Sequence, residues 1–390
     1  MSTADVLVVG AGLSGLVCAQ ACQQKGLSVH VLEASQCVGG RVQSDTINGA
    51  ICDHGFQVFL PAYPTARTLV KPLNINWKAY PKTAIIHGEK PQWFGPPFSS
   101  GIGEKLPLTP GDYWQLLRDT AAGFRHSQSN QSLSTDVHLR HYSSTVEQQF
   151  LRPFFASVFL DPELQAPAHL FQYYLSLFLR GGVAIPSGGM GEISQRLASQ
   201  LLPDTLRLNT PVAAIKKTHG YWHAETPSGL FSSPIIVIAT AHHHACELFP
   251  ELAPASRALP VSTHYFLTDT VPDTFGPLTL FPSGNQCHHV AIPTQVAPEY
   301  TADHRHLIMA TTYGTDTVSA DAIKDELGAY TCTKHWAWIH HIGLAHSLPE
   351  VRAKLSTDPS CIFAGDWTTF PSIEGACQSG ISAAQGVGTR

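Results

Sequence analysis

The residues with the clearest chemical meaning are glycines near the N-terminus. Residues 10 to 15 read Gly10-Ala11-Gly12-Leu13-Ser14-Gly15, a Gly-x-Gly-x-x-Gly pattern. In this pattern the first glycine permits a tight turn, the second lets the backbone approach a pyrophosphate, and the third lets a helix pack closely on a strand. The N-terminus of the helix that follows presents free N–H groups and a positive dipole end to phosphates. We therefore expect a dinucleotide to bind at this turn.

The elements around these glycines are the ones that such a site requires. A short β-branched run predicts a strand at residues 6–9, and residues 13–25 predict a helix that ends at Gly26. Residues 28–33 predict a second strand, which completes a βαβ unit of a parallel sheet. Glu33 ends this strand, where its carboxylate can accept hydrogen bonds from ribose hydroxyls and disfavours the 2′-phosphate of NADP.

Beyond residue 55 the pattern of elements changes. Residues 61–111 are rich in Pro and Gly, which predicts short strands and turns. Further on we expect helices at residues 113–124, 145–159, 167–179 and 192–202, strands at 206–215, 221–225, 235–239 and 361–366, and a closing helix at 375–385. The strands between residues 206 and 239 are expected to return to the N-terminal sheet. This order indicates a nucleotide-binding domain interrupted by a second domain in two pieces.

A second glycine motif distinguishes between the dinucleotides. The segments Val8–Leu16 and Val31–Ala34, followed by Gly39-Gly40-Arg41-Val42, together resemble the opening signature of the flavin-containing amine oxidoreductase superfamily. Its members include monoamine and polyamine oxidases, protoporphyrinogen oxidase and the carotenoid desaturases. The resemblance implies FAD as the cofactor. It also implies an α/β fold, with a Rossmann-like FAD-binding domain of the glutathione reductase or p-hydroxybenzoate hydroxylase type and a discontinuous α+β substrate domain.

The division into these two domains can be placed along the chain. We expect the FAD-binding domain at residues 1–75, 187–245 and 355–390, and the substrate domain at residues 76–186 and 246–354. Both ends of the chain therefore contribute to the nucleotide site.

The resemblance also implies which residues contact FAD. Arg41 would lie near the pyrophosphate, where its permanently charged fork suits two phosphates, and Asp366 would hold the ribityl or pyrophosphate region. The residues expected to contact the cofactor are Gly10, Ala11, Gly12, Leu13, Ser14, Gly15, Glu33, Ala34, Gly39, Gly40, Arg41, Val42, Gly55, Phe56, Gln57, Val212, Gly365, Asp366, Ile373, Glu374, Gly375 and Ala376.

The substrate side shows no recognisable catalytic set. None is demanded, because a flavin accepts hydride itself and the protein supplies orientation and exclusion of water. His54, Gln57 and His289 are the catalytic candidates, with an ordinary structural role as the alternative for each. Amine oxidases of the superfamily carry an aromatic wall of an amine cage just before the Ile-Glu-Gly-Ala segment, where this chain has Pro371 and Ser372. The C-terminal motif, Gly365-Asp366-Trp367-Thr368 followed by Ser372-Ile373-Glu374-Gly375-Ala376, resembles the carotenoid desaturases more closely.

Three kinds of function remain open. We expect an FAD-dependent oxidoreductase that removes hydride from a fairly apolar organic substrate, in the manner of a desaturase or oxidase, with O2, a quinone or another acceptor reoxidising the flavin. An amine oxidase is the alternative within this class. A non-catalytic FAD-binding scaffold or ligand carrier is the alternative from another class. An NAD-dependent dehydrogenase would rest on the first glycine motif alone.

Composition argues against other classes. The net charge is −5 and the Lys and Arg residues are scattered, so the sequence shows no basic patch that would bind nucleic acid. The 21 histidines show no metal-ligand spacing, so we expect no metal site. The chain opens without a signal-peptide pattern and its nine cysteines include no Cys-x-x-Cys pair, which indicates a cytoplasmic protein. The apolar residues 170–179 are too few to cross a membrane and leave a peripheral contact open.

Overall fold

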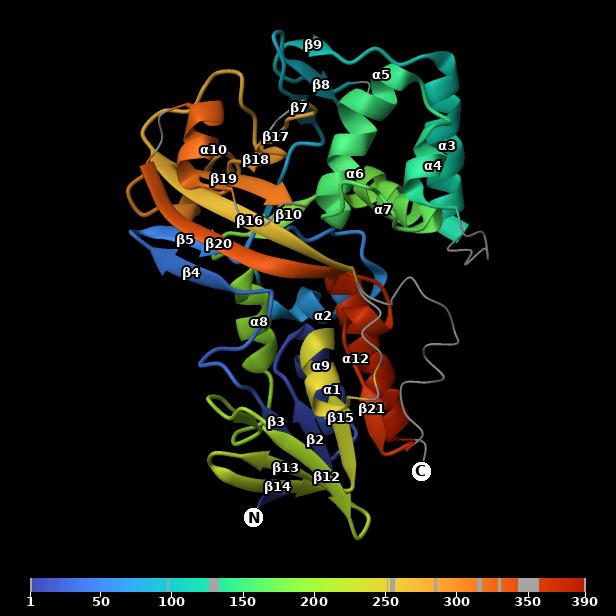
Figure 1. Ribbon diagram of the computed structural model, residues 1–390, viewed down its shortest axis with the longest axis vertical. Helices are drawn as coiled ribbons and strands as arrows, with labels where there is room; N and C mark the ends of the chain where they lie inside the picture. The colour runs from blue at the N-terminus through green and yellow to red at the C-terminus, as the bar shows by residue number, and fades with distance from the viewer. Residues whose placement is uncertain are drawn as a thin grey trace.

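The computed structural model describes residues 2–96, 98–125, 133–250, 252, 257–283, 286–313, 318–328, 331–342 and 358–388. The boundary expected between residues 354 and 355 lies outside these residues. The chain forms a lower half built around a parallel sheet and an upper half built around a larger sheet and a group of helices (Figure 1).

The lower half contains a five-stranded parallel sheet with the strand order β11-β3-β2-β15-β21. Its strands are β2 (Val6–Val9), β3 (Val29–Leu32), β11 (Leu206–Arg207), β15 (Ile235–Ile238) and β21 (Cys361–Phe363). Helices α1 (Leu13–Gln24) and α12 (Ile373–Val387) pack against each other beside it (Figure 1). The strands come from three separate stretches of the chain, and the predicted α/β fold with a parallel sheet is confirmed.

Part of the sequence prediction for this half is wrong. The strands expected at residues 206–215 and 221–225 do not all return to the parallel sheet. Instead β12 (Ala214–Thr218), β13 (Tyr221–Thr226) and β14 (Gly229–Ser233) form an antiparallel ribbon, which β1 (Ser2–Thr3) extends. The physical reason is that β13 buries only one face, with Trp222 and Ala224 against the parallel sheet, and a one-sided strand suits an antiparallel layer.

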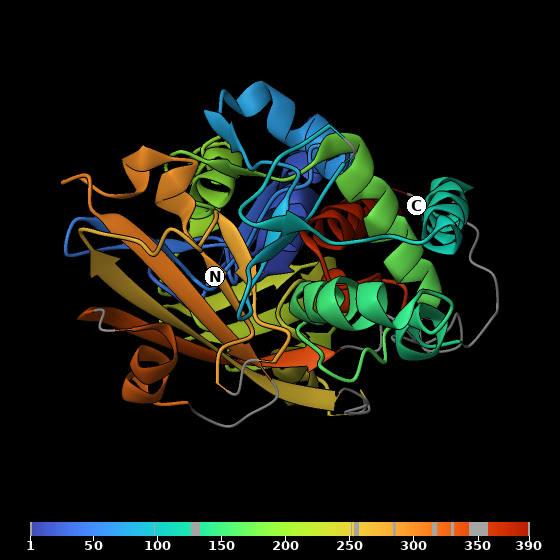
Figure 2. The ribbon, with the colours of Figure 1, turned by 90° about the horizontal axis from the view of Figure 1, so that it is seen from above.

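The upper half contains an eight-stranded sheet with the order β20-β16-β19-β18-β17-β7-β8-β9. Its strands are β7 (Ala84–Ile86), β8 (Gln92–Phe94), β9 (Glu104–Lys105), β16 (Arg257–Thr268), β17 (Leu278–Leu280), β18 (His289–Ala291), β19 (His306–Tyr313) and β20 (Thr331–Ile342). Seen from above, the helical group lies to one side of the long strands of this sheet (Figure 2).

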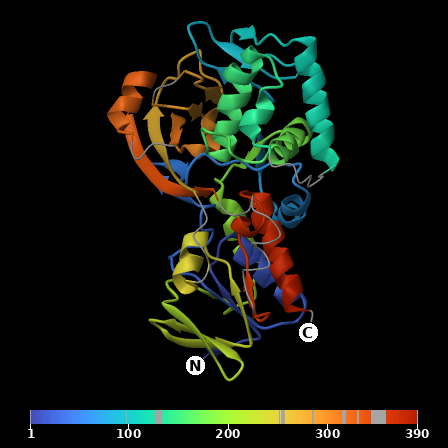
Figure 3. The ribbon, with the colours of Figure 1, turned by 45° about the vertical axis from the view of Figure 1, so that its right-hand side comes forward.

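The helical group supplies several of the aromatic residues of the upper half. It consists of α3 (Pro110–Arg125), α4 (Thr135–Leu139), α5 (Ser144–Val146), the π-helical turn Glu147–Leu151, α6 (Arg152–Phe159) and α7 (Ala168–Gly181). Helices α3 and α7 pack along each other, and α6 lies beside them (Figure 3). Phe150, Phe154 and Phe178 form a continuous run of ring contacts with centroids 5.1–5.2 Å apart.

The remaining elements lie outside these sheets and the helical group. They are α2 (Pro64–Val70), α8 (Gly191–Ala198), α9 (His242–Leu248), α10 (Ala320–Leu327), β4 (Ser44–Ile47), β5 (Ala50–Asp53), β6 (Trp77–Ala79), β10 (Ala184–Pro186) and the 3-10 turns Lys71–Leu73, Pro293–Gln295, Pro298–Tyr300 and Asp366–Thr368, the last labelled η6. Helix α2 lies in the stretch where the sequence predicted only strands and turns. Its start at Pro64 is a favoured position for proline, but its N-terminus is capped by a residue of α12 that is remote in sequence.

Asp53, at the end of β5, connects several of these elements. One of its carboxylate oxygens accepts hydrogen bonds from the Ser44 hydroxyl at 2.5 Å and from the Met190 N–H at 2.8 Å. The other accepts one from the Tyr300 hydroxyl at 2.9 Å, and the Tyr265 hydroxyl donates to the Asp53 carbonyl. The side chain is buried, and burial raises the pKa of Asp53 from its usual 3.8 to about 6 despite these hydrogen bonds.

This pKa makes stability depend on pH. Folded Asp53 holds its proton more tightly than the unfolded chain does, so its contribution to stability is full below pH 3.8 and is lost as the pH rises through 6. The loss amounts to about 3 kcal/mol at 1.36 kcal/mol per pKa unit. We expect Asp53→Asn, whose amide can still bond to Ser44, Met190 and Tyr300, to lack this slope in urea unfolding curves recorded between pH 4 and 7.

A matched control comes from Asp321, whose side chain is 88% exposed. Asp321→Asn is expected to keep the slope of the wild type. Equal slopes in the wild type and Asp53→Asn would show that Asp53 does not carry the effect.

Candidate cofactor and substrate site

A single large cavity extends from the parallel sheet into the upper half. Its volume is about 1710 Å³, above the roughly 300–1,000 Å³ of a pocket for one small molecule. The glycine turn lines one end, and aromatic residues of the upper half line the other. The cavity therefore has room for a cofactor and a second molecule next to it.

Most of the residues predicted from the sequence meet at this cavity. Those that line it are Gly10, Gly12, Leu13, Ser14, Glu33, Ala34, Gly39, Gly40, Arg41, Val42, His54, Phe56, Gln57, Val212, Gly365, Asp366, His289, Ile373 and Ala376. Those that do not line it are Ala11, Gly15, Gly55, Glu374 and Gly375.

The glycine turn has the geometry that close approach of a phosphate needs. Gly10 has a φ of +102°, which favours glycine, and a Cβ on Gly15 would lie only 2.0 Å from the Gly10 carbonyl oxygen. A Cβ on Gly12 would meet nothing within 4 Å. Gly12 also caps α1 without any side-chain hydrogen bond, so the first N–H groups of the helix have no capping side chain.

Glu33 is held over this turn. One of its carboxylate oxygens accepts a hydrogen bond from the Ala11 N–H at 2.7 Å, and the other accepts from the N–H and hydroxyl of Ser35 at 2.9 and 2.8 Å. A carboxylate has about four acceptor positions, so about one remains for a ribose hydroxyl. Ala11 thus contributes by positioning Glu33 although it does not line the cavity.

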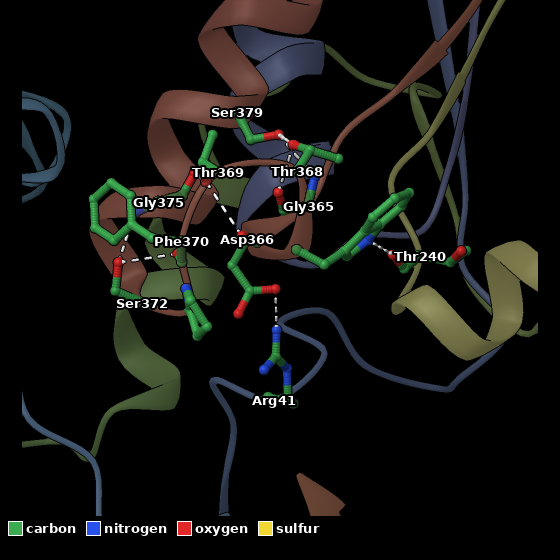
Figure 4. Close-up of polar contacts among 12 residues, drawn as sticks. Arg41, Thr240, Gly365, Asp366, Thr368, Thr369, Phe370, Ser372, Gly375 and Ser379 are labelled. Carbon is green, nitrogen blue, oxygen red and sulfur yellow. Dashed lines mark hydrogen bonds and ion pairs between the residues drawn. The ribbon is translucent and has the colours of Figure 1, made fainter. Parts of the chain in front are cut away.

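Arg41 and Asp366, which the sequence placed separately near the cofactor, form an ion pair with an Nη2–Oδ1 distance of 2.5 Å (Figure 4). The Asp366 charge raises the pKa of the Arg41 guanidinium, which therefore stays charged. The Arg41 side chain is still 55% exposed and has further N–H donors on its fork. The pair joins the N-terminal Gly-Gly-Arg segment to η6 at the other end of the chain.

The segment after Asp366 is fixed to α12 by short polar contacts (Figure 4). The Gly365 N–H donates to the Ser379 hydroxyl at 2.8 Å, and the Thr369 hydroxyl donates to the Gly375 carbonyl at 2.8 Å. A Cβ on Gly375 would lie 2.0 Å from the Phe370 carbonyl oxygen. Gly375 therefore packs the loop against the helix.

The Glu374 carboxylate does not line the cavity and forms hydrogen bonds with α2. The side chain is fully buried and accepts hydrogen bonds from the N–H groups of Thr65 at 2.9 Å and Ala66 at 2.8 Å. These are orphan donors at the start of α2, so Glu374 caps that helix from α12. Capping therefore holds this side chain against α2, and a cofactor contact at Glu374 stays a prediction.

Thr240 is a residue that sequence reasoning missed. It lines the cavity, and its buried hydroxyl has no hydrogen-bond partner among the described residues. Its position directly after β15 was the available signal, because ligands of open α/β sheets bind outside the carboxyl ends of the strands. The free helix start, Glu33, Arg41 and the Thr240 hydroxyl together fit a dinucleotide.

The other end of the cavity is apolar. Its aromatic lining residues include Tyr80, Phe94, Phe150, Phe154, Phe155, Tyr174 and Phe178. Two cations, Lys82 and Lys105, also line this end and donate to the backbone carbonyls of Leu179 and Pro96 at 3.3 and 3.2 Å. All carboxylates among the described lining residues, Glu33, Glu247 and Asp366, lie at the dinucleotide end.

The three candidate catalytic residues all line the cavity, but differ in their contacts. His54 faces Asp45 with an Nε2–Oδ2 distance of 3.3 Å. The Gln57 amide donates to the carbonyls of Arg41 at 2.6 Å and His54 at 2.9 Å, which fixes the loop around Phe56. His289 lies beside the Phe56 ring, with centroids 5.3 Å apart.

The described residues contain no group of three or more His, Cys, Asp or Glu that could hold a metal ion. No helix in the described part of the chain is long and apolar enough to span a membrane.

The fold and the site define a dinucleotide-binding protein with an adjoining apolar pocket. Residues 13–230 match the family of flavin containing amine oxidoreductases, and the chain belongs to this family. Its cofactor is accordingly FAD, as predicted, and not NAD.

Individual relatives agree with this assignment. The chain is 24% identical over 272 residues to an L-amino acid dehydrogenase from Synechocystis sp., covering 63% of this chain and 57% of that protein. It is 27% identical over 237 residues to a putrescine oxidase from Kocuria rosea, covering 54% of this chain and 49% of that protein. The alignments thus span about half the length of these curated relatives.

Solved structures share the whole fold. A putrescine oxidase carrying two substitutions superposes with a TM-score of 0.74 at 19% identity, covering 100% of both chains. Cyclohexylamine oxidase from Brevibacterium oxydans superposes with a TM-score of 0.69 at 18% identity, covering 98% of both chains. At these identities the likeness concerns the fold.

The second and third glycines of the turn, Gly12 and Gly15, have separable tasks, which substitution can test. We expect Gly12→Ala to leave the stability of the apoprotein unchanged, because its methyl group enters open space, but to weaken FAD binding by roughly five- to 150-fold (about 1–3 kcal/mol of steric cost). Gly15→Ala is expected to destabilise the apoprotein itself, because its methyl group collides with the Gly10 carbonyl. Thermal unfolding of the apoprotein and FAD titration check both, and equal effects of the two variants would contradict the assignment.

Proposed function

We propose that the protein is an FAD-dependent oxidoreductase that removes hydride from a fairly apolar organic substrate, in the manner of a desaturase or oxidase. The observation that carries this proposal is the single cavity, which has a dinucleotide site at one end and an aromatic pocket at the other. Bound FAD supplies the hydride acceptor. The protein's own residues then have to bind the cofactor, orient the substrate and exclude water.

Each of these tasks has supporting residues. The glycine turn and the start of α1 would hold the pyrophosphate, and Glu33 would hold a ribose. Arg41 would donate its remaining N–H groups, those not bonded to Asp366, to a phosphate. The loop around Phe56, fixed by Gln57, would support the flavin ring. The stacked rings of Phe94 and Phe150, 3.8 Å apart, form part of a wall that excludes water from the reacting carbon.

The same reasoning supports a division of the chain into domains. We propose an FAD-binding domain of residues 1–75, 187–245 and 355–390 and a substrate domain of residues 76–186 and 246–354. The strands of the parallel sheet all fall in the first set of residues, and the strands of the eight-stranded sheet all fall in the second.

The charges at the substrate end disfavour amine oxidation. An ammonium substrate needs carboxylates or a cage of aromatic faces, whereas the charged lining residues at this end are Lys82 and Lys105. Pro371 and Ser372 also line the cavity where an aromatic cage wall was expected for amine oxidases. An apolar neutral or anionic substrate suits this lining better than a diamine.

The proposal can be tested with the purified protein. We expect a yellow preparation with a flavin spectrum, and we expect anaerobic bleaching by apolar substrates with an activated C–H bond to be at least about tenfold faster than bleaching by putrescine or benzylamine. The reason is that repulsion by two lysines and the lack of a nearby carboxylate cost an ammonium on the order of 1.4 kcal/mol or more, which is a factor of ten.

Dithionite serves as the control, because it reduces any accessible flavin. A colourless preparation that cannot be reconstituted with FAD would contradict the cofactor site. Faster bleaching by the amines would favour the amine oxidase alternative. If dithionite reduces the flavin but no organic substrate reduces it, the non-catalytic scaffold or ligand carrier would be favoured.

A further inference from the structure

Besides the Thr240 hydroxyl, two further buried polar atoms of cavity-lining residues have no hydrogen-bond partner among the described residues. They are Nε2 of His289 and the hydroxyl of Tyr80, and both residues line the cavity. Both rings pack against Phe56, with centroid distances of 5.3 Å for His289 and 6.3 Å for Tyr80. A buried polar group without a partner is costly, so both atoms are poised to gain from a ligand that supplies one.

The partner of the other ring nitrogen fixes the tautomer of His289. Its Nδ1 lies 3.0 Å from the Ser157 hydroxyl oxygen, and that hydroxyl donates its only proton to the Pro153 carbonyl at 2.9 Å. A carbonyl can only accept, so with its proton donated to Pro153 the Ser157 oxygen acts as acceptor toward His289. His289 therefore carries its proton on Nδ1, and Nε2 presents a lone pair.

Both groups keep these roles over the physiological pH range. Burial and the neighbouring His288 lower the pKa of His289 to about 3, so the imidazole is neutral. Burial and the negative charge of Asp53 raise the pKa of Tyr80, so its hydroxyl stays protonated. Over this pH range Nε2 of His289 is thus a hydrogen-bond acceptor and the Tyr80 hydroxyl is a donor.

The pair lies at the junction between the two ends of the cavity. His289 begins β18, next to the lining residues Leu278 and Leu280 of β17, whereas Tyr80 follows β6. Phe56, which contacts both, belongs to the loop that Gln57 fixes to Arg41. A substrate lying between the aromatic pocket and the cofactor must pass this wall.

We propose that His289 and Tyr80 form a positioning pair that selects an apolar substrate with a neutral polar group, which donates an N–H or O–H to Nε2 of His289 and accepts the hydroxyl proton of Tyr80. A hydroxyl group, or an N–H beside a carbonyl, meets both requirements. A pure hydrocarbon leaves both atoms unsatisfied and is disfavoured. The inference rests on the proposed function, which identifies the molecule bound beside the cofactor as a substrate.

The test uses the FAD-loaded protein and two matched pairs of small probes. Indole and 1-methylindole differ in an N–H donor, and acetophenone and ethylbenzene differ in a carbonyl acceptor. Dissociation constants are read from the perturbation of the flavin absorption spectrum, which needs no turnover. In the wild type we expect indole and acetophenone to bind about five- to tenfold more tightly than their partners, as one net neutral hydrogen bond allows.

The variants separate the two atoms. His289→Asn keeps a donor for Ser157 but has no acceptor at the Nε2 position, so we expect it to lose the preference for indole and keep that for acetophenone. His289→Gln places an amide oxygen near that position and is expected to restore part of the indole preference. Tyr80→Phe is expected to lose only the acetophenone preference. Tyr142→Phe, a buried tyrosine bonded to Asp119 away from the cavity lining, is expected to change neither.

The outcomes distinguish the inference from the proposed function. An indole preference that persists in His289→Asn overturns the inference, as does a loss of FAD affinity in His289→Asn or Tyr80→Phe without a change in probe preference, because the atoms then serve the cofactor. It is also possible to measure that the probe preferences follow the expected pattern but that no organic substrate reduces the flavin. This result supports the pair and overturns the proposed function. Flavin reduction by hydrocarbons as fast as by their hydroxylated analogues overturns the pair alone.

Discussion

The nucleotide half depends on how closely three backbones approach one another. A Cβ on Gly15 of α1 would lie 2.0 Å from the Gly10 carbonyl at the end of β2, and a Cβ on Gly380 of α12 would lie 2.5 Å from the Ser14 carbonyl of α1. Side chains at these places would separate the helices from the sheet and from each other. Because they are absent, the start of α1 sits directly over the strand ends, and α12 holds the C-terminal motif against the N-terminal one.

This packing explains why polar groups from both ends of the chain meet at one site. With α12 against α1, η6 brings Asp366 to Arg41, and Glu374 at the start of α12 reaches the N-terminus of α2. The Arg41 side chain of the ion pair is half exposed and open to a phosphate, whereas the Glu374 carboxylate is fully buried. Burying that carboxylate is tolerated because N–H groups at a helix start and the Gln378 amide satisfy it. One motif thus supplies both a ligand contact and a structural cap.

The sequence allowed the glycine turn, Glu33 and the parallel sheet to be predicted because each depends on residues within one βαβ unit. The task of Glu374, the helix α2 and the Thr240 hydroxyl could not be predicted in the same way, because they depend on partners brought together only by folding. The prediction for the ribbon β12–β14 was wrong for a related reason. A short strand that alternates buried and exposed residues suits an antiparallel layer, and the strands with which it pairs depend on the sheet that this layer covers. The candidate His289 was found, but its tautomer follows from Ser157 and Pro153, which lie in α6.

The distribution of polarity along the cavity sets how its two ends can act. Charges gather at the dinucleotide end, where Arg41 and Asp366 offset each other and Glu33 is satisfied by N–H and O–H groups. The aromatic end has few polar groups, so its low polarity strengthens any hydrogen bond formed there and penalises one left unmade. An unmet acceptor and an unmet donor on residues that both pack against the Phe56 ring are therefore strong discriminators, because a substrate that lacks the matching groups must leave both of them buried and unpaired. If the proposed function holds, apolar surface would supply the affinity of this pocket and these two atoms its selectivity.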